Sequence, residues 1–172
     1  MYVYHVTTEH HAKRIHKEGI HRQSIDGYSL RLEMDKIADT VGQRLYGDKW
    51  VNRRDGVYFW ETINQAQQNT ETNIYDTILT IDPKRLKTAP AVSDVWKLPT
   101  AKWENLYSEL HTADFQPFNI PENTEIWNKI STIIEQAHPD DGNRDGTHEL
   151  WAQTPVSADA IIDSNTLSNS PR

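Results

Sequence analysis

Residues 2–20 read YVYHVTTEHHAKRIHKEGI, and they set the opening of the fold. Residues 2–7 are mostly β-branched or aromatic, which predicts a short strand. Thr7 or Thr8 can cap a helix, and the helix ends at Glu18 because Gly19 suits the left-handed position after a last helical turn. Ile20 then packs back onto the helix. The chain therefore opens with a strand, a helix, a glycine and an apolar residue.

Apolar spacing and turn residues predict the remaining elements. We expect helices over residues 29–46, 102–110 and 123–137, a short helix after a capping box that starts at Thr62, and strands over residues 57–60, 74–81, 147–152 and 161–162. Asn123 is the expected cap of the clearest helix, which carries one apolar stripe. Together these elements make an α+β domain.

Length and composition limit the class of protein. The chain has 172 residues, which suits one domain. It has no cysteine, so disulfides, thiolate metal sites and cysteine nucleophiles are excluded. No apolar run reaches the ~18 residues that a membrane span needs, and the N-terminus lacks a basic stretch followed by a long apolar one. We therefore expect a cytoplasmic protein with no membrane partner.

A net charge of −7 argues against a broad nucleic-acid-binding surface, because neutralising phosphates needs clustered lysine and arginine. A local exception runs from His10 to Arg22, where four basic residues and four histidines accompany a single glutamate. We interpret this segment as a solvated helix face, and a contact for the phosphates of a dinucleotide or a nucleic acid is the alternative. His10, His11 and His16 lack a supporting aspartate or cysteine pattern, so no metal is expected.

Three residues are candidates for chemistry. His5 lies in the first strand, Tyr58 follows an Asp-Gly turn, and Glu149 lies within an otherwise apolar late strand. Each has an ordinary structural explanation when it is taken alone, as a hydrogen-bonded histidine, a core tyrosine or a carboxylate on a sheet edge. Their order and their flanking residues are more informative.

The flanks of these residues resemble the ADP-ribosyltransferase-like family. Residues Tyr4–Thr7, followed by a helix that ends in Glu18–Ile20, resemble the family's opening. Residues Asp55–Trp60, followed by a capped helix, are similar to its second element. Residues His148–Leu150 and Pro155–Ile161 are similar to its last strand, proline turn and closing strand. The match is to the histidine–tyrosine–glutamate branch, which includes diphtheria-toxin-like enzymes and poly-ADP-ribose polymerases.

This resemblance implies a split β-sheet core with flanking helices. It also implies that NAD is a co-substrate and that ADP-ribose is transferred to a macromolecular acceptor, either protein or nucleic acid, in a toxin or effector role. The implied domain spans residues 1–163, with 21–54 and 82–146 as family-variable insertions and 164–172 as a disordered tail.

The resemblance also assigns the site. Glu149 is the expected catalytic residue, because its carboxylate binds the nicotinamide-ribose 2′-hydroxyl and offsets charge as an oxocarbenium-like ribose forms. His5 binds a hydroxyl of the adenosine ribose, and Tyr58 stacks on the nicotinamide. The further cofactor-binding candidates are Val6, Thr7, Arg53, Arg54 and Trp60.

Each of these further candidates has a specific role or an alternative. Val6 stands where many family members have glycine, so its backbone groups remain available but its side chain must turn away from the nicotinamide. Arg53 and Arg54 can reach the pyrophosphate or belong to a solvated loop. Trp60 lies on the same strand face as Tyr58 and is either a pocket wall or a core residue.

Two other functions remain open. An NAD-dependent RNA 2′-phosphotransferase also opens with a histidine strand, but it relies on a basic quartet that Arg14, Arg53 and Arg54 do not reproduce. A non-catalytic module that binds NAD or ADP-ribose on the same fold is the second. Val6 favours this module, and an intact Glu149 argues against it.

Overall fold

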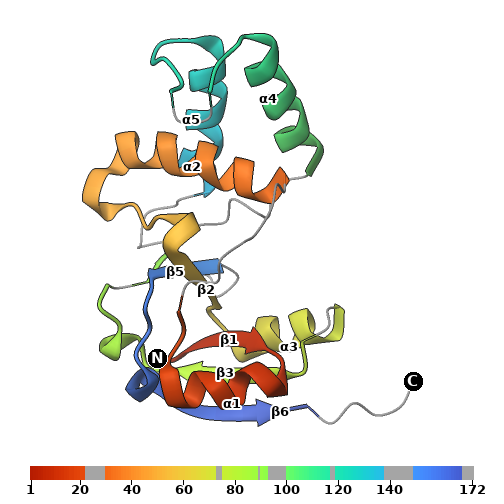
Figure 1. Cartoon of the computed structure of the whole chain (residues 1–172), viewed down its shortest axis with the longest axis vertical. Coiled ribbons are helices and arrows are strands. Elements are labelled where there is room, and N and C mark those ends of the chain that lie inside the picture. Colours follow the sequence, from red (N-terminus) through yellow and green to blue (C-terminus); the bar gives the residue numbers. More distant parts are fainter. Residues whose placement is uncertain are drawn as a thin grey trace. The chain divides into compact units, whose positions relative to one another are not determined.

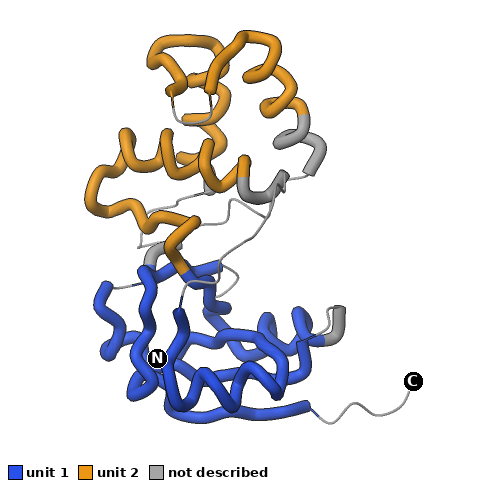
Figure 2. The backbone as a smooth tube through the Cα atoms, in the orientation of Figure 1, with its two compact units in different colours: residues 1–22, 57–90, 144–172 blue, residues 23–56, 91–143 orange. Residues whose placement is uncertain are grey.

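The computed structural model describes residues 1–21, 30–72, 75–88, 90–92, 100–116, 119–137 and 149–167. The chain forms two compact units (Figure 2). Unit 1 contains residues 1–22, 57–90 and 144–172, and unit 2 contains residues 23–56 and 91–143. Unit 2 is therefore built from two excursions of the chain, and these overlap the two stretches expected as insertions.

Unit 1 is organised around a sheet with β1 at its centre. Its strands are β1 (Val3–Thr7), β2 (Gly56–Trp60), β3 (Thr77–Ile81), β5 (Glu149–Gln153) and β6 (Ile161–Thr166). They lie in the order β5, β2, β1, β3, β6. β1 is antiparallel to both β2 and β3, and β3 is antiparallel to β6. With the helices described below, this sheet confirms the α+β class.

The first turns of two helices in unit 1 agree with the sequence predictions, and of the two candidates Thr7 and Thr8 it is Thr8 that caps α1. In α1 (Glu9–Glu18), the Thr8 side chain accepts a hydrogen bond from the backbone N–H of His11. In α3 (Ile63–Thr72), Thr62 and Gln65 form the reciprocal capping box, because each backbone N–H donates to the other side chain. Both helices are thus specified locally at their first turn.

Gly19, at the end of α1, packs closely against the turn that precedes β6. Its φ is +80°, and its N–H donates to the carbonyl oxygen of Ile15. Ile20 exchanges two backbone hydrogen bonds with Val156, of 2.8 and 2.9 Å, and both side chains are buried. A Cβ on Gly19 would lie 2.1 Å from the Val156 carbonyl oxygen, so only glycine permits this approach.

Unit 2 is helical. It contains α2 (Leu30–Tyr46), α4 (Thr100–Thr112) and α5 (Glu125–Ala137) (Figure 1). The two-residue strand β4 (Ala91–Val92) also falls within the residues of unit 2. The core of this unit is formed by buried apolar residues of the three helices and the segments beside them: Met34, Ile37, Ala38, Val41, Trp50, Leu106, Leu110, Ile120, Ile126, Trp127, Ile130 and Ile134. The apolar stripe predicted for α5 is therefore confirmed as a buried face. Within the described residues, no helix has the length and apolar character to cross a bilayer.

Gly42 is explained by the packing of unit 2. A Cβ at this position would lie 2.4 Å from ring carbons of Trp50, which is buried against α2. The Trp50 indole N–H donates to Asp39 at 3.0 Å. The glycine, which costs helix propensity, thus makes room for the indole ring of Trp50.

The ends of α5 and β6 differ from the sequence predictions, as does the start of β3, which begins at Thr77 and not at residue 74. α5 is capped by Thr124, whose hydroxyl accepts from the Trp127 N–H at 3.1 Å, whereas the predicted cap Asn123 adopts a φ of +65°. β6 continues to Thr166, three residues into the predicted disordered tail, because pairing with β3 holds it. The remainder of that tail after Leu167 lies outside the described residues.

Candidate active site

His5 lies in the middle of β1 and is bonded to β2. Its Nδ1 is 3.0 Å from the backbone carbonyl oxygen of Tyr58. A carbonyl only accepts, so Nδ1 carries the proton, and in the neutral ring Nε2 keeps a free lone pair as an acceptor. Burial lowers the pKa of His5 below its ordinary value, and the hydrogen bond to Tyr58 opposes this only in part. The imidazole is therefore neutral at pH 7.

β1 and β2 pair with each other over only a short stretch. Tyr4 and Trp60 are the one registered pair of these strands, whereas β1 and β3 are registered over five pairs. Continued for two more residues, this register would place Val6 opposite Tyr58. Instead, the His5 side chain bonds the Tyr58 carbonyl. An imidazole thus takes up a backbone acceptor that a regular ladder would use.

Tyr58 is at the centre of a group of aromatic rings. Its ring centroid is 5.5 Å from that of His5, 6.1 Å from that of Trp60 and 5.9 Å from that of Trp151. All three spacings lie in the range of tilted or edge-to-face ring contacts. Tyr58 and Trp60 are both partly exposed, so neither is a fully buried core residue.

Glu149 lies on β5, the strand that contributes Trp151 to this group. It opens β5, is 6% exposed, and lies two residues before Trp151. Side chains two apart in a strand share a face, with a spacing of roughly 7 Å. β5 is also the neighbour of β2 in the sheet. The carboxylate therefore lies on the face of β5 whose next side chain contacts Tyr58.

Trp151 is the residue that sequence reasoning missed. It is 4% exposed, and its ring contact with Tyr58 links β5 to β2. The signal in the sequence was the alternation of Glu149 and Trp151 on one strand face. That signal could not be used without knowing that β5 lies next to β2, although it follows β2 by about ninety residues of sequence.

Val6 and Thr7 are held by the core of the sheet. The Val6 side chain is buried in a cluster with Ala66 of α3 and Ile78 of β3, against which Tyr58 and Trp60 also pack. The valine side chain is therefore accommodated within unit 1. Thr7 is 5% exposed, and its carbonyl oxygen accepts from the Asp76 N–H at 3.2 Å.

Arg53 and Arg54 lie in unit 2, in the short 3₁₀ helix η2 (Arg53–Asp55). Arg53 is 2% exposed, and its Nε donates to Asp35 at 2.9 Å. The Arg54 Nε donates to Asp39 at 3.0 Å, and Asp39 also accepts from the backbone N–H of both arginines. Two aspartates of α2 thus hold both guanidinium groups within unit 2, where they help to fix η2.

The basic face of α1 is exposed and partly neutralised. Lys13 pairs with Glu9 at 2.8 Å and Arg14 approaches Glu18 at 3.8 Å, each one helical turn apart. Such exposed ion pairs contribute little to the stability of the fold and are typical of a solvated helix surface. Among the residues that the structure describes, no three histidine or carboxylate side chains are grouped for a metal.

A cavity of about 440 Å³ lies in unit 2, lined by residues of α4, α5 and the segment between them. None of its lining residues belongs to the group around His5 and Tyr58. None of these residues was a functional candidate from the sequence, and Ile126 was expected only as part of the apolar stripe of α5.

No family model, curated protein or solved structure matches this chain. The site is therefore interpreted from its own residues and their geometry.

Proposed function

We propose that this chain is an NAD-dependent ADP-ribosyltransferase whose active site lies in unit 1, around His5, Tyr58 and Glu149. The observation that carries the proposal is the convergence of three distant segments. The imidazole of His5 bonds the Tyr58 carbonyl, the Tyr58 ring contacts Trp151, and Glu149 shares the strand face of Trp151. These are the three residue types of the histidine–tyrosine–glutamate branch, in one sheet and in the order β5, β2, β1.

The chemistry follows from these groups. The bond between the ribose and the nicotinamide nitrogen breaks, the nicotinamide leaves with the bonding electrons, and positive charge develops on the ribose. The Glu149 carboxylate offsets this charge and holds the 2′-hydroxyl. The acceptor's nucleophilic atom then forms the new bond to the ribose, and its proton passes to the Glu149 carboxylate. A carboxylate in a buried setting is effective in this role because little water screens it.

His5 and Tyr58 supply binding and orientation. The tautomer fixed by the Tyr58 carbonyl leaves Nε2 of His5 able to accept a hydrogen bond from a ribose hydroxyl. The Tyr58 ring, held between Trp60 and Trp151, offers a face for the nicotinamide, and such a contact is worth about 0.5–1.5 kcal/mol beyond area burial. Arg53 and Arg54 have no role in this proposal, because aspartates of α2 bind them.

The direct test is the release of nicotinamide from labelled NAD, with protein, DNA and RNA offered as acceptors. Glu149→Gln should lower the rate by about 10²–10³, since it removes one preorganised charge and keeps the side-chain shape. Tyr58→Phe should change the rate far less. Glu18→Gln, an exposed carboxylate of α1, is the matched control and should behave as wild type.

Other outcomes would select the alternatives. NAD binding without nicotinamide release, with every class of acceptor, would leave a non-catalytic binding module. Loss of phosphate from a 2′-phosphorylated RNA would indicate the phosphotransferase, although the engagement of Arg53 and Arg54 by Asp35 and Asp39 speaks against its basic quartet.

A further inference from the structure

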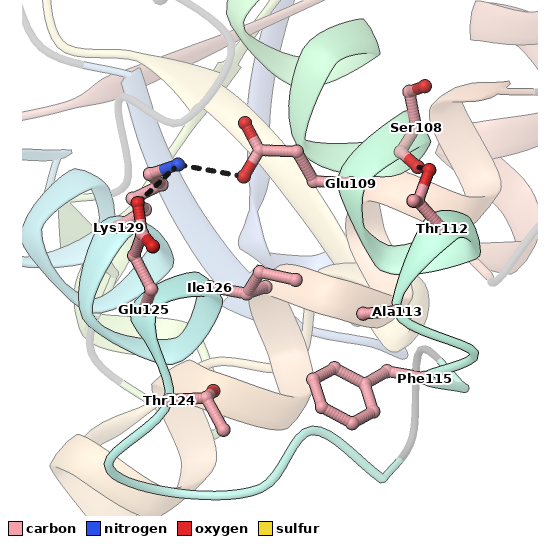
Figure 3. Close-up of a pocket in the computed structure, with 9 residues that line it drawn as sticks. All are labelled: Ser108, Glu109, Thr112, Ala113, Phe115, Thr124, Glu125, Ile126 and Lys129. Atoms are coloured by element: carbon pink, nitrogen blue, oxygen red, sulfur yellow. Dashed lines mark hydrogen bonds and ion pairs between the residues drawn. The ribbon is translucent and has the colours of Figure 1, made fainter.

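The cavity of unit 2 has an apolar side and a charged side. Phe115 and Ala113 line one side, and Ile126 of α5 lies between this side and the charged group (Figure 3). On the other side, Lys129 donates to Glu109 of α4 at 2.9 Å and lies 3.1 Å from a carboxylate oxygen of Glu125. A cavity of about 440 Å³ is within the usual range of ligand-binding pockets.

The charged side has an excess of negative charge. Hydrogen bonds to Glu109 and then Glu125 raise the pKa of Lys129, so this lysine stays cationic and offsets one of the two carboxylates. Lys129 occupies one oxygen of each carboxylate, and a carboxylate can accept through both. A second cation can therefore bind here without displacing the first.

The surrounding chain has the same bias. Residues 105–137 contain five acidic side chains and a single lysine, with no arginine. The acidic residues are Glu109, Asp114, Glu122, Glu125 and Glu135. Arg44 of α2 lies 3.8 Å from Glu122 and offsets part of this charge. The remaining carboxylates would repel a phosphate backbone and attract a lysine- or arginine-rich segment.

We propose that this cavity docks a basic peptide segment of a protein partner, with an aromatic or large aliphatic side chain against Phe115 and Ile126 and a lysine or arginine on Glu109 and Glu125. In protein interfaces, a buried apolar side chain commonly anchors the partner, and polar or charged groups surround it at the rim. The proposal rests on the proposed function only in naming this partner as the acceptor of ADP-ribose. It makes the acceptor a basic protein and not a nucleic acid.

The test measures how a fluorescein-labelled peptide of alternating arginine and phenylalanine binds to the full chain. Binding is monitored by fluorescence anisotropy in the absence of NAD. An otherwise identical peptide with glutamate in place of arginine and a single-stranded oligonucleotide are the comparison probes. We expect only the basic peptide to bind, and its affinity to fall as salt rises. Preferred binding of the oligonucleotide, or equal binding of both peptides, would overturn the proposal.

Two variants locate the site. Glu109→Gln combined with Glu125→Gln should weaken binding of the basic peptide about three- to tenfold, as expected for two solvent-exposed charges. Glu9→Gln combined with Glu18→Gln is the matched control, because it removes two exposed carboxylates that also face cations on a helix, and it should leave affinity within about twofold. Ser108→Trp, at an exposed position of α4 on the cavity's rim, should block binding and leave the core intact.

This test is independent of the reaction. Peptide binding to wild type that survives in Glu149→Gln, together with lost nicotinamide release, supports both proposals. If the chain binds the peptide but never releases nicotinamide, the docking proposal stands and the proposed enzymatic function is wrong. If wild type, the Glu109/Glu125 double variant and Ser108→Trp bind the peptide with equal affinity, the docking proposal is wrong, whatever the result with NAD.

Discussion

The two nitrogens of His5 have different roles, and two substitutions can separate them. Nδ1 holds the Tyr58 carbonyl at 3.0 Å, and Nε2 is the proposed acceptor for a ribose hydroxyl. In His5→Asn, the amide nitrogen can take the place of Nδ1, but nothing replaces Nε2. In His5→Gln, the amide reaches the position of Nε2, and the bond to Tyr58 is lost.

The expected magnitudes follow from one hydrogen bond in each case. A neutral hydrogen bond contributes about 0.5–1.5 kcal/mol net, which corresponds to roughly a two- to twelvefold change in an equilibrium constant. His5→Asn should therefore weaken NAD binding by this factor and keep the free energy of unfolding within about 0.5 kcal/mol. His5→Gln should lower the free energy of unfolding by about 0.5–1.5 kcal/mol and retain more of the NAD affinity.

The assay is calorimetric titration of NAD in a Glu149→Gln background, so that the reaction does not consume the ligand, with urea unfolding of each variant in parallel. The reasoning is refuted if His5→Asn binds NAD as the parent does while His5→Gln loses affinity. That result would mean that His5 acts only by holding the Tyr58 carbonyl.

The same imidazole sets a pH dependence. Its pKa in the folded chain is lowered by burial, so on acidification the unfolded chain takes up this proton first. The contribution of His5 to stability is thus complete above the unfolded value of about 6.5 and falls as pH drops below it toward the lower folded value. NAD affinity should fall only at the lower pH at which the folded imidazole itself takes up a proton, because that protonation removes the Nε2 acceptor. The difference between wild type and His5→Asn in urea unfolding at several pH values isolates this contribution.

Three further predictions concern stability. Gly42→Ala should lower the free energy of unfolding by up to about 2 kcal/mol, because displacing Trp50 costs about 1–3 kcal/mol and alanine recovers about 1 kcal/mol of helix propensity; a urea midpoint higher than wild type would contradict the packing argument. Gly19→Ala should cost about 2 kcal/mol or more, because a Cβ would meet the Val156 carbonyl oxygen at a φ of +80°, and an unchanged melting temperature would show that this turn can relax. Glu61 is 2% exposed, and both its carboxylate oxygens are buried without a hydrogen-bond partner in the part of the chain that the structure describes. Glu61→Met should therefore raise the free energy of unfolding by about 1–3 kcal/mol, and a loss of stability would reveal a partner for the carboxylate.

Local signals in the sequence were enough to define individual elements. The Thr8 cap and Gly19 delimit α1, Thr62 with Gln65 starts α3, and the isoleucine spacing of α5 identifies its buried face. These features depend on residues within a few positions of one another. Hydrogen bonds of a first turn and the 3.6-residue period are therefore readable without any knowledge of the tertiary fold.

The arrangement of the site was decided only by the tertiary structure. Trp151 became part of the site because β5 lies beside β2, and Arg53 was assigned to the interior of unit 2 because Asp35 of α2 faces it. Nothing near these residues in the sequence announces those neighbours, since strand order and helix packing are set by burial of the whole apolar surface. The sequence alone determined which residues carry reactive groups, whereas the fold decided which of those groups meet.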